Sequence, residues 1–291
     1  MEKHRCPTSQ PNRLKNRPNP PTNSLERALA VLEALEQTPG GLRHAEISQR
    51  LRIPKSTCSY ILARLEQRGY LSRDEESGRY QIGLTTVALA HGALREIGLR
   101  SIAEPALYKV AAETGLSAGI GVLARGRVLI IDRVEGSAFV RDAVQVAEEL
   151  PARWAAQARR YRVRAERDVG RELPAHSTAL GKVLLAFLPR EEVLALIARH
   201  GLARFTRKTI TSKARLLREL DFVRRDGYAM ADGEHQAGLR SIAVPIYALS
   251  GEVSAGVALN GGVYEAAWAD ASLLLEKVKA AGREISRRAR F

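Results

Sequence analysis

Residues 53–71 read IPKSTCSYILARLEQRGYL, and SGRYQIG follows at residues 77–83. In the first segment, apolar side chains recur at the spacing of one helix face, at Cys58, Ile61, Leu62 and Leu65. Pro54 is suited to the first turn of this helix because proline lacks the N–H that a first turn leaves unbonded. Gly69 is expected to end the helix. The pattern therefore predicts a short helix with one buried stripe and one exposed face.

Two more helices are predicted before this one. Ser24 is a favourable N-cap for a helix with apolar residues at helical spacing, and Pro39-Gly40-Gly41 ends that helix. A second, short helix follows, with Ala45, Ile47, Ser48 and Leu51 as its inward or small positions. Only residues 51–54 separate it from the third helix, so the second and third helices form a helix-turn-helix.

Two short alternating runs follow the third helix, at residues 70–73 and 79–82. The polar segment between them, DEESG at residues 74–78, ends in glycine and is typical of a hairpin turn. Three helices followed by a hairpin predict a winged helix-turn-helix domain at residues 24–83.

The remainder of the chain predicts a linker helix at residues 84–99 and a mixed α+β domain at residues 100–291. In that domain, strands are expected at residues 116–124, 128–134, 240–248 and 252–260. Helices are expected at residues 178–188, 190–200, 212–225 and 265–290. About 190 residues are enough for one ligand-sensing domain.

The composition excludes several classes of protein. No run of about 18 apolar residues exists in the 291-residue chain, so no membrane span is predicted. The N-terminus lacks the apolar segment of a secretory signal. Only Cys6 and Cys58 occur, which excludes a disulfide framework and a cysteine-rich zinc site. A cytoplasmic protein is the expectation.

The formal net charge is +14, which favours a polyanionic partner. The charge is spread along the chain: residues 1–99 carry 15 basic and 10 acidic residues, and residues 100–291 carry 31 and 22. Charge alone therefore does not locate a nucleic-acid site. Residues 1–23 contain five of the twelve prolines and few apolar side chains, so a disordered tail is predicted there.

The exposed face of the third helix carries small hydroxyl groups, a phenol and two cations. Such groups at a helix N-terminus suit phosphates and base edges in a DNA groove. The residues expected to contact DNA are Lys55, Ser56, Thr57, Ser59, Tyr60 and Arg64 on the helix and Arg79 on the wing. The alternative is that these side chains form only a solvated face.

Four segments resemble the IclR family of bacterial transcriptional regulators, over roughly residues 24–288. They are SLERALAVLEALEQ (24–37), the helix and wing quoted above, LPAHSTALGKVLLA (173–186) and GYAMADGEHQAGLRSIAVPI (227–246). The resemblance implies a winged helix-turn-helix, a linker helix and a C-terminal GAF-like domain that binds a small-molecule effector. It further implies a homodimer or homotetramer on a palindromic double-stranded operator.

The resemblance also implies positions for the effector pocket. One side would be formed by His176, Ser177, Thr178, Ala179 and Gly181, where exposed N–H groups at a helix start offer a site for an anion. The other side would be formed by Asp232, Glu234, Ser241, Ala258 and Asn260. Helix capping by Ser177 and Thr178, and structural roles for the two carboxylates, remain alternatives.

Several positions depart from the family pattern. Ala231 replaces the first of two acidic residues, Ser241 replaces a frequent cysteine, and Ala258 and Asn260 replace two serines. Fewer hydroxyl groups favour a larger, less polar effector than pyruvate or glyoxylate, such as an aromatic acid. Tyr60 stands where arginine is usual, which suggests a contact to a base edge or thymine methyl. Residues 139–160 make the link between the strand at residues 128–134 and the helix at residue 178 longer than is usual in the family.

Two other functions are weighed against a regulator. His176, Ser177 and Asp232 could form a hydrolase trio, but no Gly-x-Ser-x-Gly nucleophile elbow is present, so no catalytic residues are assigned. A non-specific basic nucleic-acid binder would use the +14 charge and show no preferred sequence. The six histidines are scattered, so neither a metal nor a cofactor is expected.

Overall fold

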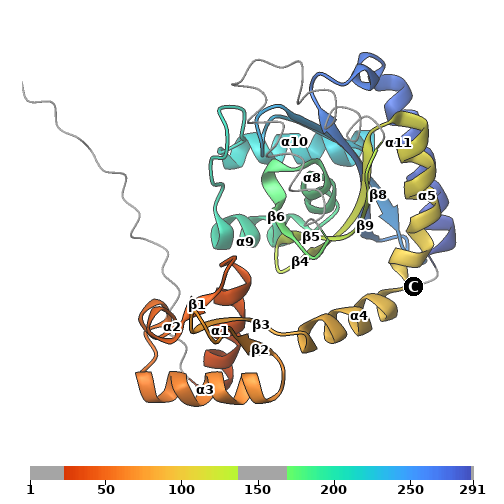
Figure 1. The fold of residues 1–291 in the computed structure, drawn as a ribbon. Coiled ribbons are helices and arrows are strands. Elements are labelled where there is room, and N and C mark those ends of the chain that lie inside the picture. The colour runs from red at the N-terminus through yellow and green to blue at the C-terminus, as the bar shows by residue number, and fades with distance from the viewer. Residues whose placement is uncertain (1–22, 137–168, 290–291) are drawn as a thin grey trace, which may run out of the picture. The chain divides into compact units, whose positions relative to one another are not determined.

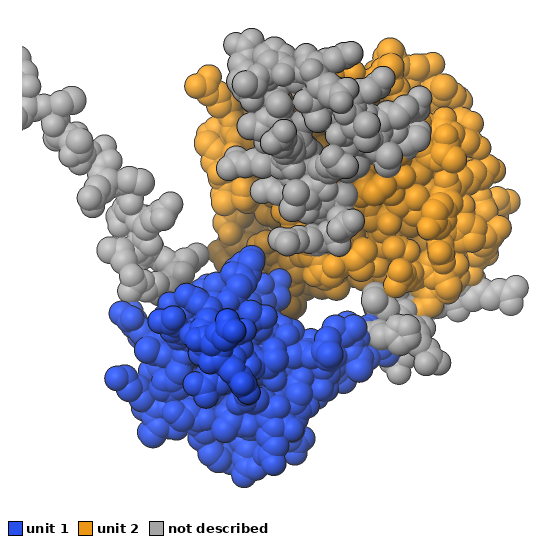
Figure 2. Space-filling view, viewed as in Figure 1, with its two compact units in different colours: residues 1–93 blue, residues 94–291 orange. Residues whose placement is uncertain are grey.

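The computed structural model describes residues 23–136 and 169–289. The chain forms two compact units, residues 1–93 and residues 94–291 (Figures 1 and 2). The predicted disordered tail, except for its last residue, lies outside the described residues. So does the segment 139–160.

The first unit is built on α1 (Ser24–Glu36), α2 (His44–Leu51) and α3 (Lys55–Gln67). Its core is formed by apolar side chains from all three helices and the wing, among them Val31, Leu35, Ile47, Cys58, Ile61, Leu62 and Leu71. The predicted stripe of α3 is confirmed, with Leu65 only partly buried at its end.

The turn between α2 and α3 is held by backbone and side-chain contacts. Arg52 ends α2 in the left-handed region, with φ of 54°. The buried hydroxyl of Ser48 donates a hydrogen bond of 2.7 Å to the carbonyl of Ile53. This bond satisfies a carbonyl inside the turn and fixes how α3 leaves α2.

The wing consists of β2 (Leu71–Arg73) and β3 (Arg79–Ile82), which pair antiparallel as predicted. A further strand, β1 (Leu42–Arg43), pairs with β3 on its other side and gives the order β1-β3-β2. The sequence analysis missed β1 because two residues are too short to show alternation.

Two element boundaries in this part of the chain differ from the prediction. The N-cap of α1 is Asn23, whose side chain accepts a hydrogen bond of 2.8 Å from the Glu26 N–H, so the prediction of Ser24 was wrong by one residue. The linker helix, α4 (Thr85–Ile97), is followed by a separate helix, α5 (Leu99–Thr114), that was not predicted. Gly98, with φ of 61°, separates them.

The second unit is built on a curled antiparallel sheet in the order β6-β5-β4-β9-β8-β7 (Figure 1). Its strands are β4 (Ser117–Ala124), β5 (Arg127–Val134), β6 (Glu172–Pro174), β7 (Ala229–Asp232), β8 (Leu239–Tyr247) and β9 (Val253–Gly262). The two predicted hairpins, β4 with β5 and β8 with β9, are confirmed, and they pair with each other through β4 and β9.

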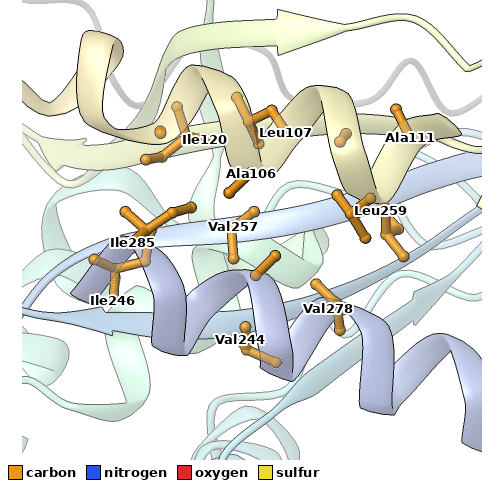
Figure 3. Close-up of a cluster of buried hydrophobic side chains, with 14 of the residues drawn as sticks. Ala106, Leu107, Ala111, Ile120, Val244, Ile246, Val257, Leu259, Val278 and Ile285 are labelled. Carbon is orange, nitrogen blue, oxygen red and sulfur yellow. The ribbon is translucent and has the colours of Figure 1, made fainter. Parts of the chain in front are cut away.

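Each face of this sheet is covered by helices. On one face, α5 and α11 (Ala271–Arg288) bury an aliphatic core with Ile120, Val257 and Leu259 (Figure 3). On the other face lie α8 (Ala179–Ala186), α9 (Arg190–His200) and α10 (Lys213–Asp226). The buried alanines Ala243 and Ala258 face α8, and small residues there allow a helix to approach the sheet closely.

The predicted closing helix began too early. Residues Ala266–Ala269 form a 3-10 turn, and α11 begins at Ala271, capped by the Asp270 side chain. Within residues 23–136 and 169–289, no helix has the length and apolar character needed to cross a membrane.

Candidate functional site

The outward face of α3 carries most of the residues predicted to contact DNA. Lys55, Ser56, Ser59, Tyr60 and Arg64 are exposed, and Thr57 is half-buried. Tyr60 is 59% exposed, and the Arg64 guanidinium lies 5.4 Å from its ring centroid. A cation over an aromatic face orients both groups, so Tyr60 and Arg64 project together from one patch of the helix.

Ser59 also has a structural contact. Its hydroxyl lies 2.9 Å from His44 Nε2, and the same ring nitrogen lies 3.1 Å from the carbonyl oxygen of Lys55. His44 is the first residue of α2, so this contact ties α2 to the start of α3. The sequence analysis did not identify His44, because its role depends on the approach of two helices.

Arg79 is the first residue of β3, directly after the hairpin turn of the wing. Its guanidinium donates a hydrogen bond of 2.8 Å to the carbonyl of Gly41 and lies 3.4 Å from the Glu46 carboxylate. These contacts join β3 to β1 and α2, which is a structural role that the sequence analysis did not foresee. A phosphate contact by Arg79 stays a prediction.

In the second unit, the loop before α8 has the geometry of a helix cap. The Thr178 hydroxyl accepts a hydrogen bond of 3.2 Å from the Gly181 N–H and donates one of 3.0 Å to the carbonyl of Pro174. A Cβ added at Gly181 would lie 2.1 Å from the carbonyl oxygen of Ala175. Ala179 is buried in the same turn. Close packing of this loop therefore requires glycine at position 181.

His176 and Ser177 are buried and point to different partners. His176 Nε2 lies 3.0 Å from the carbonyl oxygen of Ala203, and burial lowers the pKa of the imidazole. The Ser177 hydroxyl lies 3.3 Å from Nδ1 of His235, a residue that the sequence analysis missed. The Phe205 ring packs against both imidazoles, with centroids 5.8 Å from His176 and 4.9 Å from His235.

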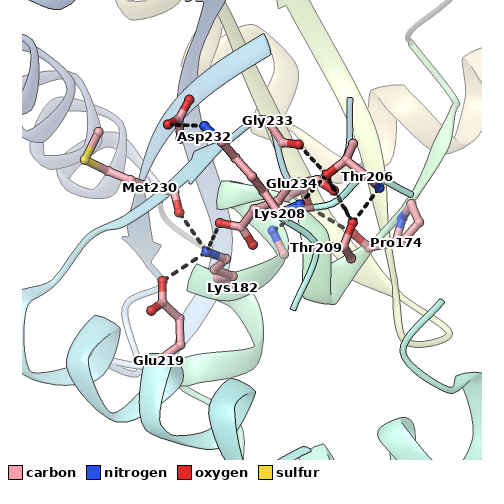
Figure 4. A network of polar contacts seen from close by, with 12 residues as sticks. Pro174, Lys182, Thr206, Lys208, Thr209, Glu219, Met230, Asp232, Gly233 and Glu234 are labelled. Carbon is pink, nitrogen blue, oxygen red and sulfur yellow. Dashed lines mark hydrogen bonds and ion pairs between the residues drawn. The ribbon is translucent and has the colours of Figure 1, made fainter. Parts of the chain in front are cut away.

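A buried lysine lies beside these residues. The Lys182 amine, only 1% exposed, donates to the carboxylates of Glu219 at 2.9 Å and Glu234 at 2.6 Å and to the carbonyl of Met230 at 2.8 Å (Figure 4). Burial raises the pKa of Glu234, and the adjacent ammonium opposes that rise. Glu234 thus forms a structural ion pair that links β7 and the loop after it to α8.

Asp232 lies in a surface ion-pair cluster. Its carboxylate contacts Lys208 at 2.8 Å and Arg240 at 3.4 Å, and the hydrogen bond from Lys208 contributes most to a lowered pKa. His176, Ser177 and Asp232 therefore have separate partners, and the hydrolase trio is not assembled. Among residues 23–136 and 169–289, no cluster of His, Cys, Asp or Glu side chains could hold a metal ion.

The sheet brings the remaining predicted residues together. Ala231 pairs with Ser241, and Ser241 with Asn260, so these three side chains form one row across the sheet. Ala258 lies in the adjacent row on the same face, opposite Ala243. Neither Ser241 nor Asn260 makes a side-chain hydrogen bond within the part of the chain that the structure describes. This row therefore offers a hydroxyl and a carboxamide to a ligand, next to an apolar floor.

Arg133, Glu135 and Ser117 form a polar cluster beside this row and were not predicted. Arg133 Nε lies 2.7 Å from the Glu135 carboxylate, and the Ser117 hydroxyl donates to Glu135 at 2.7 Å. Ser117 pairs with Asn260 in register. Only strand pairing reveals this cluster, because its residues are far from Asn260 in sequence.

The chain thus combines a winged helix-turn-helix with a curled α+β sheet domain, and because a fold alone does not establish a function, comparison with known proteins gives the class. The model of the bacterial transcriptional regulator IclR C-terminal domain matches residues 156–287, and that of the IclR helix-turn-helix domain matches residues 24–75. The regulator XynR of Escherichia coli is 28% identical over 92% of this chain and 97% of its own. The regulator KdgR of Dickeya chrysanthemi is 31% identical over 82% of this chain and 70% of its own.

A similar solved structure is an IclR homologue from Microbacterium hydrocarbonoxydans, complexed with 4-hydroxybenzoate. It is 25% identical, with a TM-score of 0.70 over 91% of this chain and 98% of its own. The chain belongs to the IclR family of transcriptional regulators, with a helix-turn-helix DNA-binding domain and a C-terminal effector-binding domain.

Proposed function

We propose that this protein is a sequence-specific regulator that reads DNA with α3 and responds to an organic effector bound in its second unit. The observation that carries the DNA-reading role is the division of α3 into a buried apolar stripe and an exposed polar face. Ser56 and Thr57 at the helix start suit phosphates. Tyr60 and Arg64, one turn further along, suit base edges and thymine methyl groups.

The regulator would bind a palindromic operator as a dimer, because one short helix supplies too few base contacts for specific binding. Exposed apolar side chains in the first unit support a second copy as the partner. They lie on α1, at the start of α4 and along α4: Leu25, Leu29, Leu84, Val87 and Leu89. Clustered apolar side chains of this kind mark interaction sites.

The effector would lie on the sheet face between the start of α8 and the row formed by Ala231, Ser241 and Asn260. The Ser241 hydroxyl and the Asn260 carboxamide, which make no side-chain hydrogen bond among the described residues, suit the oxygen atoms of an organic acid or phenol. Ala231 and Ala258 provide an apolar wall that suits an aromatic ring. The 4-hydroxybenzoate bound by the Microbacterium homologue belongs to this chemical class.

Titration calorimetry with 4-hydroxybenzoate and pyruvate tests the effector class. We expect binding of the aromatic acid at least about tenfold tighter than that of pyruvate, a difference of about 1.4 kcal/mol. Replacing Ser241 by Ala should weaken binding of the aromatic acid. The control is Ser254→Ala, which should not weaken it. Ser254 lies at the start of β9, far along the hairpin from Ser241, and its hydroxyl contacts the carbonyl of Ile246. Tight binding of pyruvate alone would contradict this assignment.

Effector binding would change transcription by favouring one of two arrangements of the DNA-reading helices in the dimer, which requires different effector affinities for the two arrangements. Such a regulator would act in the cytoplasm, where bacterial DNA lies. Repression is the expected outcome at its operator, and it is tested by reporter expression with and without the gene for this protein.

Selection of bound sites from random duplex DNA by the full-length protein tests the DNA-reading role. We expect a palindrome, and we expect Tyr60→Ala to weaken binding to that palindrome by about 1–3 kcal/mol. Binding to unrelated duplex should change less. Recovery of unrelated sequences, with and without an aromatic acid present, would instead support a non-specific basic binder. Equal weakening of specific and non-specific binding would exclude base reading by Tyr60.

A further inference from the structure

The segment joining α9 to α10 is strongly basic. Residues 199–218 contain seven cationic side chains and no acidic residue. All seven are exposed on the second unit: Arg199, Arg204, Arg207, Lys208, Lys213, Arg215 and Arg218. We call these seven residues the α9–α10 basic surface. It is separate from the exposed face of α3, which belongs to the first unit.

Within the part of the chain that the structure describes, most of this charge has no ion-pair partner. Lys208 pairs with Asp232, but none of the other six forms an ion pair with any residue in the ranges 23–136 and 169–289. Lys213 and Arg215 lie in the first turn of α10, which contains no acidic residue. The helix dipole disfavours cations at that end. Clustered positive charge of this kind lowers stability and favours an external anion.

The segment is also held in a defined conformation. Thr209, which is 4% exposed, accepts hydrogen bonds from the N–H groups of Phe205 and Thr206 and donates to the carbonyl of Glu234 at 2.6 Å (Figure 4). The Thr206 hydroxyl donates to the carbonyl of Gly233 at 2.7 Å. The cations are therefore presented from a fixed backbone, which lowers the entropy cost of binding.

We propose that the α9–α10 basic surface binds the phosphodiester backbone of DNA that flanks the site read by α3. Five of its seven cations are arginines, whose planar fork matches phosphate oxygens. This inference rests on the proposed DNA-reading role, because DNA held by the first unit of the same chain is a polyanion at high effective concentration. An acidic protein is the other class of partner that such a surface fits.

The basic surface is also linked to the candidate effector site. Thr206 and Thr209 bond to the carbonyls of Gly233 and Glu234, in the loop that carries His235. His235 in turn contacts Ser177. The loop of residues 233–235 thus contacts both the segment that presents the cations and the candidate effector site.

The test uses the full-length protein with a triple substitution, Arg207→Gln, Lys213→Gln and Arg218→Gln. Arg215 is left intact because burial raises the pKa of Glu234 and the charge of Arg215 is among those that oppose this rise. The matched control, Lys109→Gln, Arg283→Gln and Arg287→Gln, removes the same charge from exposed positions on α5 and α11. Urea unfolding should show equal stability for both variants within about 0.5 kcal/mol.

Affinity is measured against salt concentration on two duplexes, the selected palindrome alone and the palindrome extended by about two helical turns on each side. The measured quantity is the slope of log association constant against log salt concentration. With the extended duplex, we expect this slope to be less steep in the triple variant by about 0.9 for each phosphate contact removed. The control should keep the wild-type slope. Hydroxyl-radical protection of the flanking backbone should disappear only in the triple variant.

The outcomes separate this inference from the proposed function. If the wild-type protein does not bind the short palindrome more tightly than unrelated duplex, the proposed function is overturned. If the wild type binds the short palindrome but the triple variant behaves like the control on the extended duplex, only the basic surface's role on DNA is overturned. An effect of the triple variant on transcription without any effect on DNA affinity would likewise overturn it and would point to an acidic protein.

Discussion

At the scale of single residues, the second unit depends on buried polar groups whose partners come from distant segments. The Lys182 amine is enclosed among apolar residues of α8, yet two carboxylates and one carbonyl accept its three hydrogen bonds. A buried ammonium without such partners would cost several kcal/mol. His176 is buried with Nε2 3.0 Å from the carbonyl oxygen of Ala203, and burial lowers the pKa of its imidazole. Both residues thus hold the candidate effector site together.

The buried imidazole of His176 predicts a pH dependence of stability. Burial lowers its pKa from the ordinary value near 6.5, so between the two pKa values the unfolded chain binds more protons than the folded chain. The contribution of His176 to the free energy of unfolding is therefore complete above the pKa of the unfolded state. It is lost as the pH falls toward the pKa of the folded state. The free energy of unfolding should fall from pH 7 to pH 5, and less steeply in His176→Gln.

Urea unfolding at several pH values measures this slope. His200→Gln is the matched control, because His200 is exposed at the end of α9 and should leave the slope unchanged. Identical slopes for the wild type and His176→Gln would show that the ring is not buried as a neutral group.

At the scale of elements, two helical glycines have opposite roles. Gly181 lies in the first turn of α8, where the Ala175 backbone leaves no room for a Cβ atom. Gly92 lies within α4, and nothing lies within 4 Å of the Cβ position. Glycine weakens a helix by about 0.5–1 kcal/mol relative to alanine, so only Gly181 has a packing reason that compensates for this cost.

Alanine substitutions should therefore change stability in opposite directions. Gly181→Ala should lower the free energy of unfolding by about 2–3 kcal/mol, because the loop of residues 175–178 must move away from α8. Gly92→Ala should raise it by about 0.5–1 kcal/mol. Thermal unfolding followed by circular dichroism measures both effects. Equal stability of Gly181→Ala and the wild type would mean that the loop accommodates a side chain.

At the scale of the whole molecule, the first unit leaves apolar side chains in water. Leu84 is 85% exposed, Val87 62% and Leu25 69%. Single exposed apolar residues are common, but several of them at the start of α1 and at the start of α4 are typical of an interaction surface. The domain boundaries at residues 83 and 99 stay predictions, whereas the contacts within the chain divide it after residue 93.

A charge placed in this apolar set should weaken dimers. Val87→Glu should raise the dimer dissociation constant at least about tenfold, because a carboxylate would lose its hydration in the interface. Leu249→Glu, at an exposed apolar position in the turn after β8, is the matched control. Sedimentation velocity across a range of protein concentrations measures the constants. If both variants associate like the wild type, the apolar set is not the dimer interface.

Local patterns in the sequence predicted the helices other than α5, the wing and both long hairpins, because periodic apolar residues, caps and turn glycines act over a few neighbouring positions. The sequence also determined the exposed polar face of α3 and indicated the family. Sequence reasoning missed α5, although its buried residues Leu99, Ala103, Leu107 and Val110 recur at helical spacing. Pro105 lies inside this helix, and proline is a residue that usually ends one.

Only the tertiary structure decided the environments of the site residues. It paired Glu234 with Lys182, joined Ser177 to His235 rather than to His176, and aligned Ser241 with Asn260. These contacts join residues up to 58 positions apart. Local preferences cannot specify them, because which groups meet depends on strand register and on how the helices pack against the sheet.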